Sequence, residues 1–416
     1  MPNQLVDHFF RHESGKLIAS LVRFFGLRHF DLVEDMVQAA LVEALAVWKV
    51  QGLPDQPAAW IHRVAKNRVL DALRRDKNFQ EKAENFARPE NSNSSDSIDR
   101  LFDESELKDS QLRLIFACCH STLQPDSAIP LTLKTLCGFS EEEIARGMLL
   151  SRDNVRKRIY RAKQTMIENN VSLDLPSSRQ LPARLHYVHN VLYLMFNEGY
   201  CSTSNEQAIR DDVCEEAARL CHLLTEHPHC STKTTYALLS LMLFHASRFD
   251  ARMDGEGGLV LLEAQDRSKW DRQMIERAKE YLRQSDGKAI SIYHLEAAIA
   301  LQHCDASSFA ETNWGVITGL YDRMIELFPS SVYRLNQAIA IGQKDGPEAA
   351  IEILNSLQAD VHLNRSHLLD TTFGEQYRIK GEYVLAKEHF EKAILKTISK
   401  HEQAFLRGRI AQCDLH

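Results

Sequence analysis

The chain has 416 residues, of which 44% are hydrophobic and 26% are charged, and its formal net charge is −7. A chain of this length is too long for one compact core and predicts two to four domains. The composition is that of a globular protein. No apolar run approaches the roughly 20 residues that span a bilayer, and the first residues lack the basic start and apolar stretch of a signal peptide, so we expect a cytoplasmic protein.

Helix-forming patterns extend along almost the whole chain. Proline and glycine number only 11 and 17, alternation of β-branched residues is almost absent, and apolar residues recur at spacings of three and four. The predicted fold class is therefore all-α.

The first informative element is a helix predicted from Phe30 to Trp48. On a helical wheel its apolar residues Val33, Val37, Leu41 and Ala44 share one face. Asp35 and Gln38 lie opposite, so we expect both side chains to be exposed.

The next element, from Ala58 to Lys77, concentrates positive charge in an acidic protein. It holds six Lys or Arg against two Asp. The wheel places apolar residues on one side and the polar set on the other, namely Arg63, Lys66, Asn67, Arg74 and Lys77. Two acids are too few to neutralise this face by i,i+4 pairing, so it is typical of phosphate binding. A solvated basic face is the alternative.

The segment from Asn78 to Asp109 is polar, acidic and rich in Ser and Asn near its centre. Such a composition cannot bury enough apolar surface to offset the entropy of ordering. It predicts a flexible acidic linker at residues 79–107.

A second basic element follows the linker. Ser140 and Glu143 have the spacing of a capping box, and Ser151 has the character of a second N-cap. After Ser151 an apolar stripe faces a basic set that consists of Arg152, Asn154, Arg156, Lys157, Arg158 and Arg161, and the positive charge continues to Lys163. Two short helices joined by a tight turn predict a helix-turn-helix whose second helix enters a major groove. A helical hairpin with a basic exterior is the alternative.

Three segments in this order resemble an extracytoplasmic-function (ECF) sigma factor of RNA polymerase. FDLVEDMVQAALVEALAVW resembles the region 2 helix that docks on the polymerase clamp, AAWIHRVAKNRVLDALRR the promoter-melting segment, and SEEEIARGMLLSRDNVRKRIYRAK the region 4 helix-turn-helix. The resemblance implies region 2 at 1–78 and region 4 at 108–170. It further implies a protein that binds core RNA polymerase, recognises promoter −35 and −10 elements and initiates transcription.

The resemblance also implies roles for single residues. Asp35 and Gln38 match the positions that contact the clamp, and Asn67 matches the amide that reads the flipped-out base of the −10 element. The flanking phosphates would be held by Arg63, Lys66 and Arg74, and the −35 element would be contacted by Arg152, Asn154, Arg156 and Arg158. Residues 49–56 lie where the base-capturing loop sits. His62 stands where the family usually has Tyr, which puts a stacking role there in doubt.

The C-terminal half carries a different pattern. GEQYRIKGEYVLAKEHFEKA, from Gly374 to Ala393, matches the tetratricopeptide (TPR) repeat, and looser copies precede it. We therefore expect a helical extension at 183–290 and a TPR-like solenoid at 291–416, with a concave face for a protein or peptide partner. The arrangement resembles the ECF subgroup in which such an extension is implied to govern activity.

The sequence contains no recognisable catalytic or metal-binding motif. The nine cysteines include no C-x-x-C pair and predict reduced structural thiols. The spacing of CHLLTEHPHC, Cys221 to Cys230, fits no zinc finger, and no catalytic arrangement appears, so we expect no metal, no cofactor and no enzymatic activity. Two alternatives stay open: a DNA-binding transcriptional regulator with a TPR effector domain that does not join polymerase, and a pure TPR scaffold.

Overall fold

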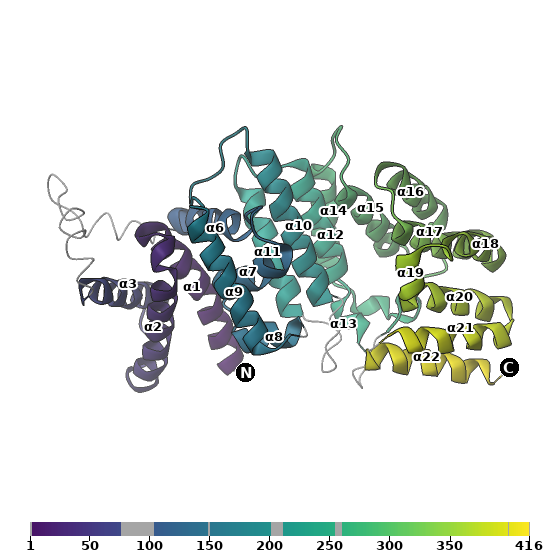
Figure 1. The fold of residues 1–416 in the computed structure, drawn as a ribbon, viewed down its shortest axis with the longest axis horizontal. Coiled ribbons are helices and arrows are strands. Elements are labelled where there is room, and N and C mark those ends of the chain that lie inside the picture. The colour runs from purple at the N-terminus through teal and green to yellow at the C-terminus, as the bar shows by residue number, and fades with distance from the viewer. Residues whose placement is uncertain are drawn as a thin grey trace. The chain divides into compact units, whose positions relative to one another are not determined.

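The structure, a computed structural model, describes residues 2–75, 104–148, 150–200, 211–253, 260–397 and 399–415. These residues form 20 α-helices and no β-strand, which confirms the predicted all-α class (Figure 1). The chain divides into two compact units, Met1–Glu198 and Gly199–His416. None of the described helices is long and apolar enough to cross a membrane.

Three long helices and one short turn begin unit 1. They are α1 (Pro2–Phe25), η1 (Leu27–His29), α2 (Phe30–Gln51) and α3 (Pro57–Arg75). The apolar face predicted for α2 is buried at Val33, Val37, Leu41 and Ala44, and Asp35 and Gln38 are exposed as expected. Gly26 and Gly52 end α1 and α2 with φ of 87° and 84°, a conformation that glycine adopts without the steric penalty of a side chain.

Five further helices complete unit 1: α6 (Glu104–Cys118), α7 (Pro125–Thr135), α8 (Glu141–Gly147), α9 (Arg152–Glu168) and the start of α10 (Leu181–Tyr200). Both predicted helix starts are confirmed. Ser140 and Glu143 form the reciprocal capping box, and the Ser151 hydroxyl accepts a hydrogen bond from the Asn154 amide. The predicted linker lies mostly outside the described residues, and α6 begins at Glu104, inside its last four positions.

The helices before and after the linker pack together within unit 1. At Gly15 of α1, an added Cβ would lie only 2.1 Å from the carbonyl oxygen of Leu136, just after α7. Arg23 of α1 contacts Glu106 and Asp109 of α6 at 3.1 and 2.8 Å. A backbone approach this close requires glycine, because any other residue at position 15 would push the two helices apart.

Within unit 1, helix α10 packs on the helices that follow the linker. Tyr187 donates a hydrogen bond to the Leu123 carbonyl, and Arg184 donates one to the Phe116 carbonyl at 2.5 Å. The sequence analysis placed this segment at the start of the extension, whereas its contacts join it to the helices that follow the linker.

Unit 2 is a succession of short helices. They are α11 (Asp211–Glu226), α12 (Lys233–Ala246), α13 (Phe249–Arg252), α14 (Arg272–Gln284), α15 (Ile292–Asp305), α16 (Trp314–Leu327), α17 (Ser331–Asp345), α18 (Pro347–Leu357), α19 (Val361–Arg365), α20 (His367–Lys380), α21 (Tyr383–Lys396) and α22 (Lys400–Cys413). In the segment with the TPR pattern, a Cβ at Gly374 of α20 would lie 2.6 Å from the Phe390 ring of α21. Small and large residues therefore interlock between these two helices. Membership of the TPR class stays a prediction.

Candidate polymerase and nucleic-acid interface

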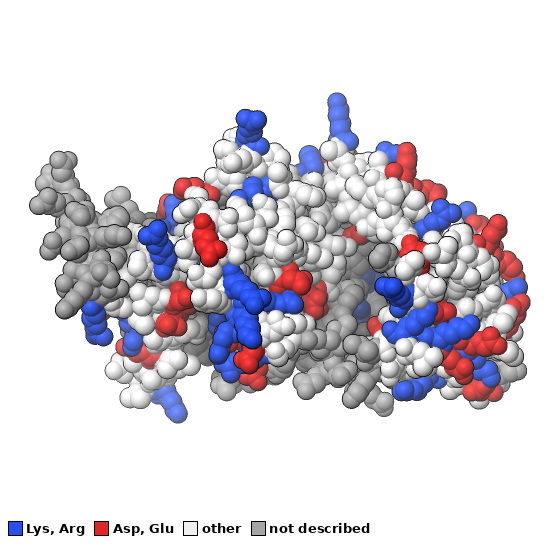
Figure 2. Space-filling view, in the orientation of Figure 1, with Lys and Arg blue, Asp and Glu red and all other residues white. Residues whose placement is uncertain are grey.

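Helix α9 presents a basic exposed face. Its apolar stripe, Val155, Ile159, Ala162 and Met166, is buried. Arg152, Asn154 and Arg156 are exposed on the other side, and Lys and Arg side chains gather over α9 in Figure 2. The stripe fixes the rotation of the helix, so the residues predicted to meet the −35 element point outward.

Nearby acids only partly offset these cations. The Nε atoms of Arg152 and Arg156 lie 3.4 and 3.5 Å from one carboxylate oxygen of Glu141. Arg158 is more enclosed and donates to the Asp126 carbonyl at 3.2 Å. Exposed ion pairs of this kind contribute little stability, about 0–1 kcal/mol each. The arginines can therefore exchange these partners for phosphates at small cost.

Helix α3 carries the second basic face. Arg63, Asn67 and Arg74 are exposed and Lys66 is half-buried. Arg68, which the predicted site does not include, reaches Glu43 of α2 at 2.6 Å and ties the two helices together. Most of the face predicted to meet the −10 element is therefore exposed among the described residues of unit 1.

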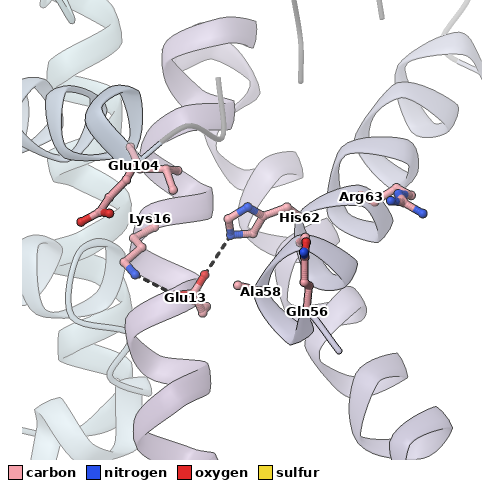
Figure 3. Close-up of a pocket in the computed structure, with 9 residues that line it drawn as sticks. Glu13, Lys16, Gln56, Ala58, His62, Arg63 and Glu104 are labelled. Atoms are coloured by element: carbon pink, nitrogen blue, oxygen red, sulfur yellow. Dashed lines mark hydrogen bonds and ion pairs between the residues drawn. The ribbon is translucent and has the colours of Figure 1, made fainter. Parts of the chain in front are cut away.

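His62 faces the interior. It is 5% exposed, and its Nε2 lies 2.8 Å from Oε2 of Glu13 on α1. Figure 3 shows His62 and Lys16 pointing toward Glu13, beside a cavity of about 520 Å³, whereas Arg63 extends away. Burial raises the pKa of Glu13, but hydrogen bonds from His62 and Lys16 lower it more, so the net shift is downward. His62 therefore holds α3 on α1. His62 stands three residues before the buried Ala65, and this helical spacing was the signal in the sequence that His62 faces the interior.

The end of α2 and the turn that follows it expose two apolar side chains. Val50 is 85% exposed and Leu53 is 71% exposed, and Gly52 between them has positive φ. Exposed aliphatic groups beside a basic helix match the wedges that other proteins insert between base steps. The sequence analysis placed the base-capturing loop in this segment but did not single out either residue.

An exposed stripe runs along α2. Asp35 and Gln38 are followed at helical spacing by Val42 and Leu45, which are 65% and 50% exposed. Contiguous exposed apolar groups beside polar ones mark protein-binding surfaces. These four residues, the α2 stripe, extend the docking face predicted from Asp35 and Gln38 alone.

Lys163 of α9, which the predicted basic face does not include, faces the interior. Its side chain is 6% exposed, and its Nζ lies 2.7 Å from Asp31 and 2.5 Å from Glu34. The same Nζ lies 4.7 Å from the centre of the Phe30 ring. Burial lowers the pKa of Lys163, but the two carboxylates raise it more, so the residue stays charged. This set of contacts, the Lys163 clasp, joins α9 to α2 instead of facing DNA. The signal in the sequence that Lys163 is buried was its position four residues after the buried Ile159.

The described residues were compared with the chemistry of metal and thiol sites. Over the part of the chain that is described, no group of three His, Cys, Asp or Glu could hold a metal ion. The described cysteines are free and buried, and burial raises the pKa of the Cys118 thiol to about 12.

Comparisons with known proteins match three parts of the chain. Sigma-70 region 2 matches residues 9–79, and Sigma-70 region 4 matches residues 113–166. A family of unknown function, DUF6596, matches residues 184–286. An uncharacterized protein of Rhizobium meliloti (strain 1021) is 33% identical over 400 residues, which cover 94% of this chain and 92% of the relative. No solved structure matches.

Proposed function

Because the chain belongs to the sigma factors, as one of the ECF-like type with a C-terminal extension, we propose that it directs core RNA polymerase to promoters with paired −35 and −10 elements. Sigma factors bind DNA and polymerase. The protein acts by binding rather than by catalysis, and we expect it to work in the cytoplasm, where promoter DNA and polymerase meet.

The α2 stripe is the observation that carries this proposal. A DNA-binding regulator that never joins polymerase has no use for exposed Val42 and Leu45 beside Asp35 and Gln38. Hydration of exposed aliphatic groups is unfavourable, and a partner that covers them recovers roughly 25 cal/mol per Å². We assign core polymerase as that partner.

The two basic faces take the DNA. We assign the −35 element to Arg152, Asn154, Arg156 and Arg158, and the −10 element to Arg63, Lys66, Asn67 and Arg74. Arg suits guanine edges and phosphates, and Asn suits adenine. Leu53 and Val50 stand beside the second face, where an apolar contact helps to hold an unstacked base.

Capture by core polymerase tests the docking surface. Val42→Ser/Leu45→Ser and Asp35→Ala/Gln38→Ala should each reduce capture of the full chain by tagged core enzyme about tenfold or more, since they remove central contacts. Val384→Ser, which changes a side chain of similar exposure in α21, is the matched control. Undiminished capture by both double variants would exclude the α2 stripe as the docking face.

We also propose that residues beyond α10 regulate the sigma modules. Residues 199–416 carry 31 Asp or Glu and 24 Lys or Arg, whereas residues 1–198 carry 26 of each. The excess acid of the protein thus belongs to unit 2, whose TPR-like helices we expect to meet a protein partner. Because α10 packs on unit 1, truncation after Tyr200 is the appropriate cut. Run-off transcription that is identical for the truncated and full chains would contradict a regulatory role.

A further inference from the structure

Unit 2 contains a cavity of about 370 Å³ that takes no part in the proposed DNA or polymerase contacts. Helices α15, α16, α17, α20 and α22 line it, together with the turn η3 (Leu262–Ala264). Its apolar wall includes Phe309, Trp314, Ile317, Tyr321, Ile339 and Phe405. Cavities of roughly 300–1,000 Å³ with apolar walls and a few convergent polar groups are typical of small-molecule sites.

Three uncharged residues that line this cavity each have a buried polar atom without a hydrogen-bond partner in the described parts of the chain. Gln376 is 2% exposed, and its carboxamide oxygen accepts no hydrogen bond from the described residues. Thr371 Oγ1 and His303 Nδ1 are likewise buried without a partner in the described parts of the chain. A buried polar atom without a partner retains its full desolvation cost. All three residues line the same cavity, so a ligand that donates hydrogen bonds would remove that cost.

The position of Gln376 depends on its neighbour across the helix pair. A Cβ at Gly342 of α17 would lie 2.5 Å from the Gln376 carboxamide oxygen. The amide therefore has room at this place only because residue 342 has no side chain. This close approach of α17 and α20 places the carboxamide oxygen against Gly342, while the Gln376 residue itself lines the cavity.

The charges around the cavity disfavour an anion. Arg409 is the one Lys or Arg among the described lining residues. Its guanidinium lies 2.6 Å from Glu375 and 2.9 Å from Glu263. Two carboxylates already neutralise this cation, so none of its charge is left for an acidic ligand.

We propose that the cavity of unit 2 binds a free, uncharged small molecule in which an apolar group adjoins a neutral amide, as in an N-acylated amino-acid amide. The amide N–H groups meet Gln376 and Thr371, which accept, and the apolar group contacts the ring of Trp314. The volume fits a molecule of this size rather than a longer peptide. Such binding would make unit 2 the sensor of the protein.

The probe is N-acetyl-L-leucinamide, titrated into the full chain and followed by saturation-transfer NMR. We expect saturable binding with Kd of about 1–10 mM, as for a fragment of this size. N-acetyl-L-leucine, which exchanges the amide for a carboxylate, should bind about fivefold or more weaker. Gln376→Leu should weaken binding of the amide about tenfold. The control Gln273→Leu, which changes an exposed glutamine of α14 outside the cavity, should bind as wild type does.

Several results would overturn the inference. They are non-saturable binding, equal affinity for the amide and the carboxylate, and unchanged affinity in a folded Gln376→Leu protein. If that variant fails to fold by circular dichroism, Thr371→Val provides the same comparison. Tighter binding of N-acetyl-Ala-Leu-Ala-amide would reject a free small molecule in favour of a peptide. The assay contains neither DNA nor polymerase, so its failure is distinguishable from failure of the proposed function.

Discussion

Removing the charge of Lys163 tests how the Lys163 clasp holds α9 to α2. Lys163→Met keeps the aliphatic stem but leaves Glu34 without its cation. Asp31 is 70% exposed and loses little, whereas the Glu34 side chain is 12% exposed, and burial already raises its pKa. Breaking a buried pair by removing one partner typically costs 3–5 kcal/mol, and proton uptake by Glu34 limits that cost, so we expect about 3 kcal/mol.

Hydrogen exchange of the full chain measures this loss locally. Peptides from α9 and the start of α2 should exchange about 100-fold faster in Lys163→Met wherever exchange proceeds by opening of the contact. Lys157→Met, which changes an exposed lysine of the same helix, is the control and should exchange as wild type does. Lys163→Met/Glu34→Gln should recover much of the protection, because replacing both partners removes the unpaired charge.

Two outcomes would refute this reasoning. Equal exchange in Lys163→Met and Lys157→Met would mean that the clasp contributes no stability. A double variant that opens as readily as Lys163→Met alone would mean that the buried Glu34 carboxylate is not the source of the loss.

Three further predictions concern the turn after α2, a helix contact and acid stability. Leu53→Ser should lower run-off transcription from a duplex promoter about tenfold, because unstacking a base step costs a few kcal/mol. Transcription from a pre-melted template should be unaffected. Equal loss on both templates would contradict a role of Leu53 in promoter opening. Gly15→Ala should lower the midpoint of urea unfolding, because the new Cβ would lie 2.1 Å from a carbonyl oxygen. Gly408→Ala should leave this midpoint unchanged or raise it, because no atom lies within 4 Å of a Cβ at that position. Burial, with nearby arginines, lowers the pKa of His303 from 6.5 to about 4 and that of His245 well below 6.5. Their stabilisation is complete above pH 6.5 and is lost as pH falls toward 4, by about 2 kcal/mol for His303 at pH 5; a urea midpoint of unit 2 that is constant from pH 7 to 5 would refute this.

Local patterns in the sequence were sufficient to predict the all-α class and to orient α2, α3 and α9. The Ser140 capping box and the Ser151 cap depend on atoms within three residues, so reading them needs no knowledge of distant contacts. Apolar spacing likewise predicted the buried side of α9 and the exposure of Asp35 and Gln38, because the side of a helix with the regular apolar spacing packs on its neighbours and the opposite side faces outward.

Tertiary structure alone decided which distant residues meet. The spacing of Lys163 marks it as buried, but its partners Asp31 and Glu34 lie 132 and 129 positions away, and no local pattern encodes such a pair. The position of the Gln376 carboxamide oxygen depends in the same way on the missing side chain of Gly342, on another helix. The period of a helix determines the direction of each side chain about the helix axis. Charge pairing and cavities depend instead on how neighbouring helices pack.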